Sequence, residues 1–140
     1  MIDSLAFLLL AASQPDAADP PACTAARARR ATVAAIARRP AQFAGQCVTV
    51  SGYVSGHSLQ SLAGETPAGS PLEVGLVGGA TRYAGPVRGP VTVTGTVDTC
   101  LHMRLRAEAR RSPSQPIVYL RGYCHRASGP VVRVEDFRVE

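Results

Sequence analysis

The sequence contains no lysine, no asparagine and no tryptophan, and aromatic residues make up only 5% of its 140 positions. All 15 basic residues are therefore arginines, which outnumber the 10 acidic residues and give a net charge of +5. A charge of this sign ordinarily points to nucleic acid or to an anionic surface. The arginines are scattered over the whole chain and form no stripe. The excess therefore indicates a GC-rich coding sequence and argues against a nucleic-acid binding protein.

Long apolar runs are missing as well. The apolar run over residues 5–12 is far shorter than the roughly 20 residues that a membrane-spanning helix needs. Ala11 and Ser13 stand three and one before a cleavage point, which predicts a signal peptide over residues 1–13. Asp3 stands where a basic residue is usual, so an upstream start or a buried N-terminal helix is the alternative. We expect an exported protein, periplasmic or secreted, with no transmembrane segment.

Cysteine is present in an even number, which in an oxidising compartment predicts two disulfides with three connectivities: Cys23, Cys47, Cys100 and Cys124. Thr24 is a good N-cap for a helix over residues 24–39, which must stop before Pro40. Such a helix rises about 22 Å, and the following residues up to Cys47 return about as far when they are extended. Chain geometry therefore favours Cys23–Cys47, which leaves Cys100–Cys124, over the other two connectivities.

Three stretches share the pattern apolar, any, apolar, any, Gly, any, apolar: VTVSGYV over residues 48–54, VTVTGTV over residues 91–97 and VYLRGYC over residues 118–124. Period-two alternation of β-branched residues predicts strands with one face packed inward. The glycine has inward parity, where it lets a strand bend as the closure of a small barrel requires. Further strands are expected over residues 72–77 and 131–139, while residues 101–108 fit either a strand or a short helix.

These elements predict a mainly β fold, a small OB-like Greek-key barrel of roughly five or six curved antiparallel strands with an N-terminal helix. We expect one barrel domain over residues 24–140, after a linker over residues 14–23. The string VTVSGYV resembles the glycine-bent opening strand of OB-fold domains, and with VTVTGTV it makes the chain similar to small periplasmic OB-fold proteins of bacteria. The next residues, SGHSLQSLAGE, lack the basic and aromatic side chains of anticodon-binding domains. The resemblance therefore implies the fold and not tRNA binding.

The neighbouring Cys124 and His125 raise several chemical hypotheses. Haem attachment needs a second cysteine where Arg121 stands. Thiol catalysis would need His125 to activate the Cys124 thiol, but adjacent residues of a strand point to opposite faces. The sequence also has no G-x-S-x-G, H-E-x-x-H or phosphate-binding glycine loop, so no enzyme and no cofactor are expected. The alternative function is the binding of copper or zinc by sulfur and nitrogen ligands: Cys100, His102, Met103, Cys124 and His125.

A ligand-binding face is the remaining hypothesis. In OB-like barrels ligands lie across strands two and three, between flanking loops. Tyrosine and arginine side chains of outward parity can supply stacking and contacts to phosphate or carboxylate groups: Tyr53, Tyr119, Arg121, Tyr123 and Arg133, with Arg88 as a further contact. The sequence thus predicts an exported, non-catalytic binding or interaction module. Its ligand is expected to be an anionic oligomer, such as an oligonucleotide or polysaccharide, or a protein partner, without sequence-specific recognition of nucleic acid.

Overall fold

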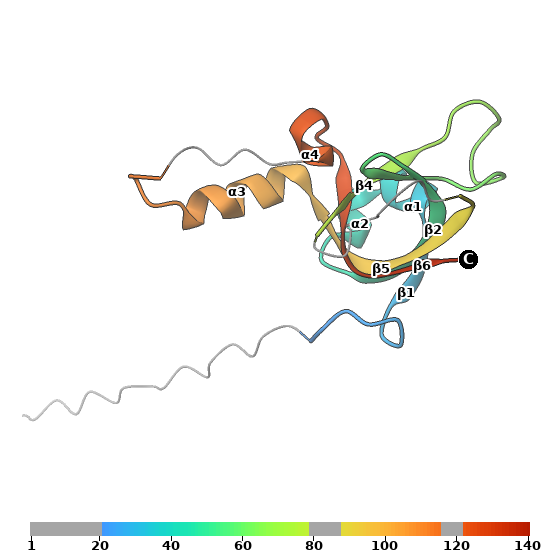
Figure 1. The fold of residues 1–140 in the computed structure, drawn as a ribbon, viewed down its shortest axis with the longest axis horizontal. Helices are drawn as coiled ribbons and strands as arrows, with labels where there is room; N and C mark the ends of the chain where they lie inside the picture. Colours follow the sequence, from blue (N-terminus) through green and yellow to red (C-terminus); the bar gives the residue numbers. More distant parts are fainter. Residues whose placement is uncertain (1–20, 79–87, 116–121) are drawn as a thin grey trace, which may run out of the picture.

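The computed structural model describes residues 21–78, 88–115 and 122–140, so the expected signal peptide over residues 1–13 lies outside the described residues. A ring of strands forms the body of the molecule, and the longest helix projects from it (Figure 1). In chain order the elements are β1 (Arg29–Thr32), α1 (Val33–Arg38), α2 (Pro40–Phe43), β2 (Cys47–Ser55), β3 (Ser58–Gln60), β4 (Glu73–Val77), β5 (Pro90–Thr99), α3 (Cys100–Arg110), α4 (Tyr123–Arg126) and β6 (Pro130–Val139).

Five strands close the barrel. Their order is β2-β3-β4-β6-β5, and β5 pairs back onto β2, while β1 is added in parallel at the other edge of β2. Strand directions cannot alternate all the way around a closed ring of five, because five is odd, so one neighbouring pair must run parallel. That pair is β4 and β6. The prediction of a mainly β barrel is confirmed. The prediction that all its strands are antiparallel is wrong for two pairings, β1 with β2 and β4 with β6.

One apolar cluster fills the interior of the barrel. Successive side chains of a strand face opposite sides, so alternate residues of β2 and β5 point into this cluster. Helices α1 and α2 lie against the ring of strands (Figure 1) and add Val33, Ile36 and Phe43 to it. The buried members from the strands are Val48, Val50, Leu59, Val74, Leu76, Val91, Val93, Val97, Val132 and Val134. The face of each strand that is turned away from this cluster remains available for other contacts.

The N-terminal helix is shorter than the sequence predicts. Strand β1 occupies part of the expected span, and α1 begins only at Val33. Its N-cap is Thr32 and not Thr24, because Thr32 Oγ1 accepts a hydrogen bond from the Ala35 N–H at 3.0 Å. The prediction of a helix over residues 24–39 is therefore wrong for its first half. There the backbone gains a ladder of hydrogen bonds with β2, and helix propensity is too weak a preference to outweigh such tertiary pairing.

Two of the three glycine-bent stretches are strands, with the glycine buried as predicted. A Cβ atom on Gly52 of β2 or on Gly95 of β5 would collide with the backbone of the neighbouring strand, at the carbonyl oxygen of Arg133 in the case of Gly95. The register between β5 and β6 shifts beside Gly95, which marks a bulge. The third stretch is not a strand where it is described, because Gly122 has a φ of 70° and α4 follows it. Residues 118–121 lie outside the described residues.

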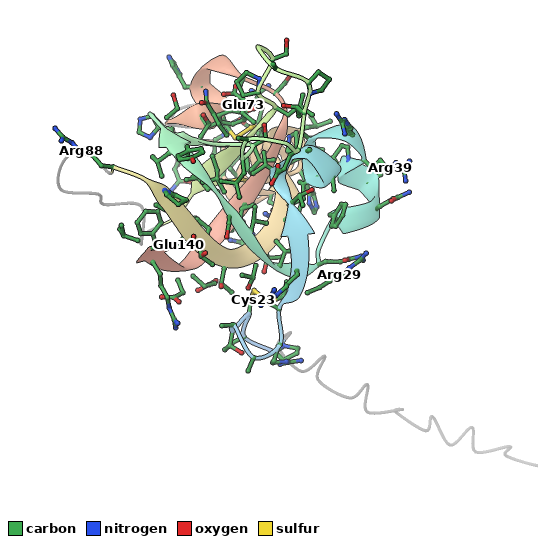
Figure 2. The ribbon with its side chains drawn as sticks, turned by 90° about the vertical axis from the view of Figure 1, so that its right-hand side faces the viewer. Cys23, Arg29, Arg39, Glu73, Arg88 and Glu140 are labelled. Carbon is green, nitrogen blue, oxygen red and sulfur yellow. A yellow bond between two sulfur atoms is a disulfide. The ribbon has the colours of Figure 1, made fainter. Side chains whose placement is uncertain are left out.

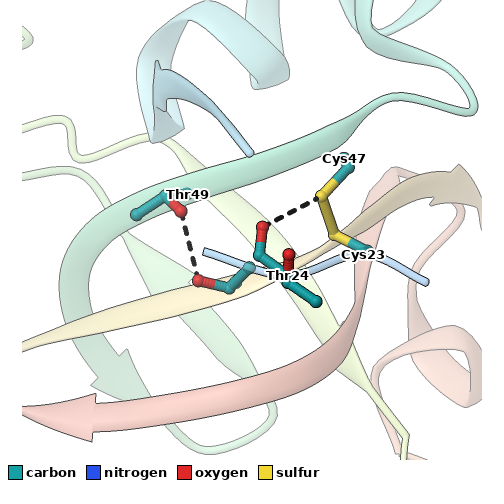
Figure 3. Close-up of a disulfide and its surroundings, with 5 residues drawn as sticks. Cys23, Thr24, Cys47 and Thr49 are labelled. Carbon is teal, nitrogen blue, oxygen red and sulfur yellow. Dashed lines mark hydrogen bonds between the residues drawn. A yellow bond between two sulfur atoms is a disulfide. The ribbon is translucent and has the colours of Figure 1, made fainter. Parts of the chain in front are cut away.

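Two disulfides are present, as predicted, and they join the pairs that chain geometry favours: Cys23 with Cys47, and Cys100 with Cys124. The first is half-buried at the start of β2, where the Thr24 carbonyl lies 3.8 Å from Cys47 Sγ (Figure 3). It closes because β1 runs beside β2, and not because a long helix returns. The second is buried with Val131 between α3, α4 and β6. It forms a second, smaller core outside the barrel.

We expect the two disulfides to differ in their accessibility to reductant. Cys100 and Cys124 are 1% and 2% exposed, whereas Cys23 and Cys47 are only half-buried, and thiol exchange needs access to a sulfur atom. Brief treatment of the folded protein with dithiothreitol and iodoacetamide should therefore label Cys23 and Cys47 first, as read by peptide mass spectrometry. Denatured protein is the control, in which all four cysteines should be labelled together. Equal labelling of both pairs in the folded protein would contradict the buried position of Cys100–Cys124.

Replacement of Gly95 by alanine tests the close approach of β5 to β6. Because the new methyl group meets backbone atoms that cannot rotate away, we expect Gly95→Ala to lower the free energy of unfolding by about 1–3 kcal/mol. Urea unfolding followed by far-UV circular dichroism measures this loss. The control is Thr96→Ala, at the next residue of β5, which is half-buried and should cost less than about 1 kcal/mol. An unchanged midpoint for Gly95→Ala would show that the two strands do not approach so closely.

Candidate functional site

A pocket of about 590 Å³ opens between α2 and the junction of β5 with α3. One part of its lining is small and apolar: Pro40, Ala41, Ala44, Gly45 and Val97. The remaining part is polar and largely charged: Asp98, Thr99, His102, Arg106 and Arg133. The size lies within the range of roughly 300–1,000 Å³ that small-molecule sites occupy, and a mostly apolar lining with a few converging polar groups is typical of them.

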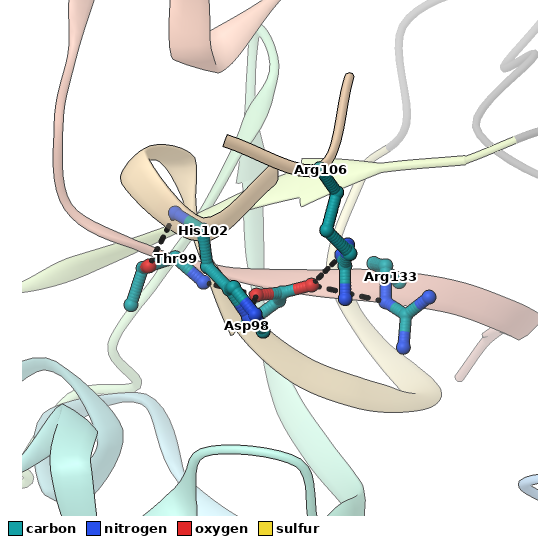
Figure 4. Close-up of polar contacts among 5 residues, drawn as sticks. All are labelled: Asp98, Thr99, His102, Arg106 and Arg133. Carbon is teal, nitrogen blue, oxygen red and sulfur yellow. Dashed lines mark hydrogen bonds and ion pairs between the residues drawn. The ribbon is translucent and has the colours of Figure 1, made fainter. Parts of the chain in front are cut away.

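Asp98 is the centre of the charged side of the pocket, and only 4% of its side chain is exposed. Its Oδ1 atom accepts a hydrogen bond from the Thr99 N–H at 2.8 Å and lies 3.0 Å from His102 Nδ1. Its Oδ2 atom accepts a hydrogen bond from Arg106 Nη2 and lies 3.4 Å from Arg133 Nε. Figure 4 shows these partners converging on the one carboxylate. A buried charge is stable here because both of its oxygens are paired.

The local sequence places three of these groups together. Alternation along β5 turns Asp98 to the outside of the barrel, and α3 starts two residues later. His102 and Arg106 follow at intervals of four residues, so they lie on the side of α3 that faces Asp98. Arg133 comes from β6, whose pairing with β5 sets it opposite Thr96. The four-residue spacing is a signal in the sequence that identifies Asp98 and Arg106, which the motif analysis missed, whereas only the strand pairing adds Arg133.

The charge state of Asp98 follows from competing effects. Burial raises the pKa of Asp98, but the hydrogen bond from the Thr99 N–H, the guanidinium of Arg106 and the hydrogen bond with His102 outweigh it, so the pKa lies below its usual value. The carboxylate is therefore ionised at neutral pH. Two guanidinium groups against one carboxylate give the cluster a net charge of one positive unit before any proton on His102 is counted.

Among the predicted ligand-binding residues, Arg133 lines this pocket. Tyr53 is 43% exposed and pairs with Pro90 near the other end of β2, roughly 20 Å along the strand from the pocket. Arg88 is exposed just before β5 and extends away from the barrel (Figure 2). Tyr119 and Arg121 lie outside the described residues. The described members of the predicted set therefore do not form one surface.

Tyr123 lies on α4 and not on an open strand face. Its ring packs over Gly75 of β4, where a Cβ atom would collide with the ring, and its hydroxyl group lies beside Gly129. Burial, and then the carboxylate of Glu73, raise the pKa of Tyr123. The expected outward position of Tyr123 is thus corrected, because the short helix after Gly122 turns this side chain into the second core.

The alternative hypothesis of a copper or zinc site needs Cys100 and Cys124 as thiol ligands. Cys100 and Cys124 are joined in a disulfide, so neither can supply a thiolate, which is the form that binds metal. Met103 packs against this disulfide, His102 contacts Asp98, and His125 is exposed on α4. In the ranges that the structure describes, no group of three or more His, Cys, Asp or Glu side chains could hold a metal ion. The disulfide therefore leaves Cys100 and Cys124 unavailable as thiolate ligands.

Comparison with known proteins adds no further identification, because no family model, curated protein or solved structure matches the chain. Within the described part of the chain, no helix has the length and apolar character needed to cross a membrane. The functional interpretation therefore rests on the geometry of the pocket around Asp98.

Replacement of Asp98 by asparagine tests the charged cluster. We expect Asp98→Asn to lower the free energy of unfolding at pH 7 by about 2 kcal/mol, because it removes the charge from the acceptor of several charge-assisted hydrogen bonds. Since the pKa of Asp98 is lowered in the folded state, its contribution is fully present above the unfolded pKa of about 3.9 and is lost as the pH falls through the folded pKa. The difference between the two proteins should therefore shrink as the pH falls below about 4.

Urea titrations at a series of pH values measure this difference. The control is Asp136→Asn, which breaks the exposed pair with Arg138 and should cost less than about 1 kcal/mol. A stability difference for Asp98→Asn that stays constant from pH 7 to pH 3 would contradict an ionised, paired Asp98.

Proposed function

We propose that this protein is an exported, disulfide-stabilised, non-catalytic binding module on an OB-like Greek-key barrel, and that it takes the anionic group of its ligand or partner at the Asp98 pocket. The anionic group can belong to an oligomer, such as an oligonucleotide or polysaccharide, or to a protein. The observation that carries the proposal is the cluster at the pocket wall, where one buried carboxylate holds two guanidinium groups and an imidazole.

The strand order supports the OB-like part of the proposal. The barrel runs β2-β3-β4-β6-β5 and closes through β2 and β5, with its last strand inserted between the third and fourth, as in a Greek key. Strands two and three of the barrel, where OB-like folds bind ligands, are β3 and β4. Here Tyr123 covers Gly75 on the outer side of β4, so we place the ligand site at the pocket beside α3 instead.

The charges of the pocket support an anionic ligand. The arginine side chains are only partly enclosed, since Arg106 is 36% and Arg133 is 46% exposed. Each uses one nitrogen atom toward Asp98, so further N–H groups of both remain free to donate, and hydrogen bonds from a charged donor to a charged acceptor are the stronger kind. The carboxylate of Asp98 already contacts four partners, so its oxygen atoms are not free to bind a cationic group of the ligand.

Binding without catalysis is favoured by the lining of the pocket. Its one hydroxyl group, on Thr99, already accepts the His102 N–H as the cap of α3, and the cysteines that are near it in sequence are oxidised. Export is supported by the two disulfides, which persist in oxidising compartments, and by the apolar run at the start of the sequence.

A panel of anions tests the proposed function by thermal unfolding at matched ionic strength. The panel contains acetate, benzoate, phosphate, sulfate, a heparin fragment and a short oligonucleotide. We expect at least one of them to raise Tm by several degrees at saturating concentration, because a ligand that binds only the folded state stabilises it. Arg133→Ala should abolish the shift, and the control Arg138→Ala, which alters an exposed arginine outside the pocket, should retain it. The proposal fails if no anion raises Tm or if Arg133→Ala responds like the wild type.

A further inference from the structure

We infer that the Asp98 pocket selects a tetrahedral oxyanion at the end of a small apolar molecule, that is, a phosphate or sulfate monoester, over a planar carboxylate. This inference rests on the proposed function, since it names the chemical class that the same pocket would take.

The separate origins of the two arginines carry the inference. Arg106 comes from α3 and Arg133 from β6, and both reach Oδ2 of Asp98, while His102 contacts Oδ1 (Figure 4). Beyond their contacts with Asp98 the guanidinium groups of Arg106 and Arg133 hydrogen-bond no other group in the described part of the chain, so the outer N–H groups of both can donate to a ligand. A carboxylate accepts best from one planar fork. A monoester with three terminal oxygens can accept from two separate guanidinium groups at once.

Asp98 prepares the site before the ligand arrives. Because it holds both guanidinium groups in place, little side-chain freedom is left to lose on binding, which favours affinity. It also keeps the net charge of the two guanidinium groups and the carboxylate at one positive unit. A dianion such as a phosphate monoester is attracted to that charge more strongly than a monoanion is. Asp98 is therefore a positioning residue and does not contact the ligand.

The apolar lining restricts what the oxyanion can be attached to. Apart from the charged and polar residues, the lining consists of Pro40, Ala41, Ala44, Gly45 and Val97, which have no polar side chain. These groups can pack against a compact apolar body but offer no side-chain hydrogen bond to a sugar or a second charged group. The volume of about 590 Å³ suits one small molecule. The structure therefore points to an end group on a small apolar body and not to the interior of a polymer.

Isothermal titration calorimetry with four matched probes tests this inference. The probes are inorganic phosphate, phenyl phosphate, phenyl sulfate and benzoate, at pH 7.5 and constant ionic strength, with the intact protein. We expect phenyl phosphate to bind at least about tenfold more tightly than benzoate, since it engages one more charge-assisted donor. It should also bind more tightly than inorganic phosphate because of the apolar wall. A comparison of phenyl phosphate with phenyl sulfate decides which oxyanion the pocket prefers.

Variants that keep the charge separate geometry from electrostatics. Arg133→Lys retains the positive charge but loses the planar fork, so we expect affinity for phenyl phosphate to fall about tenfold while Tm without ligand stays close to that of the wild type. Arg138→Lys, outside the pocket, is the matched control and should bind as the wild type does.

The outcomes distinguish this inference from the proposed function. Benzoate binding as tightly as phenyl phosphate, with both weakened by Arg133→Lys, would overturn the selectivity for a tetrahedral oxyanion and leave the pocket as an anion site. Phenyl phosphate binding equally well to the wild type, Arg133→Lys and Arg138→Lys would overturn the assignment of the ligand to this pocket. The absence of binding by all four probes, together with a Tm shift by the heparin fragment or the oligonucleotide that Arg133→Ala abolishes, would overturn this inference and leave the proposed function in place.

Discussion

Closure of the sheet through β2 and β5 is the constraint on which the rest of the structure depends. The two strands pair from Cys47↔Thr96 to Tyr53↔Pro90, and the closed ring leaves each strand with one inner and one outer face. Because the side chain of Val97 points into the barrel, the side chain of Asp98 must point outward, and α3 begins just after it at the end of β5. The position of the charged cluster therefore follows from the way the barrel closes, and a change in register by one residue would move Asp98 into the apolar core.

The cluster around Asp98 connects the barrel to a helix that otherwise has little to hold it. Cys100 is the one buried residue of α3, so the helix depends on its Thr99 cap, on the disulfide and on the contacts that His102 and Arg106 make with Asp98. In turn the carboxylate is stable in a buried position only because those side chains neutralise it. The same side chains of α3 therefore line the pocket and attach the helix to the barrel.

The long connection between β5 and β6 changes what this barrel can present to a ligand. It carries α3 and α4, and the disulfide Cys100–Cys124 joins the start of α3 to α4, which lies beside β4. Gly75 leaves room on β4 for the ring of Tyr123, so that an aromatic side chain of the chain itself occupies this part of the surface. Meanwhile the start of α3 forms one side of the pocket with α2. A site beside the barrel is thus created by the same segment that covers part of its face.

Much of the fold could be predicted because strand patterns are local. Alternation and the glycines at positions 52 and 95 identify β2 and β5 and the inward face of each, and the even number of cysteines identifies the disulfides. The site was predictable only in part: the spacing of Asp98, His102 and Arg106 is visible in the sequence, but their common partner Arg133 is not. The sequence by itself determined which residues alternate between the two faces of a strand, at which glycines the strands bend, and which cysteines can form disulfides. Only the tertiary structure decided that residues 29–32 join β2 as a strand, that β4 and β6 run parallel, and that Arg133 meets Asp98. Those outcomes depend on which strands become neighbours when the barrel closes, and no local pattern encodes that.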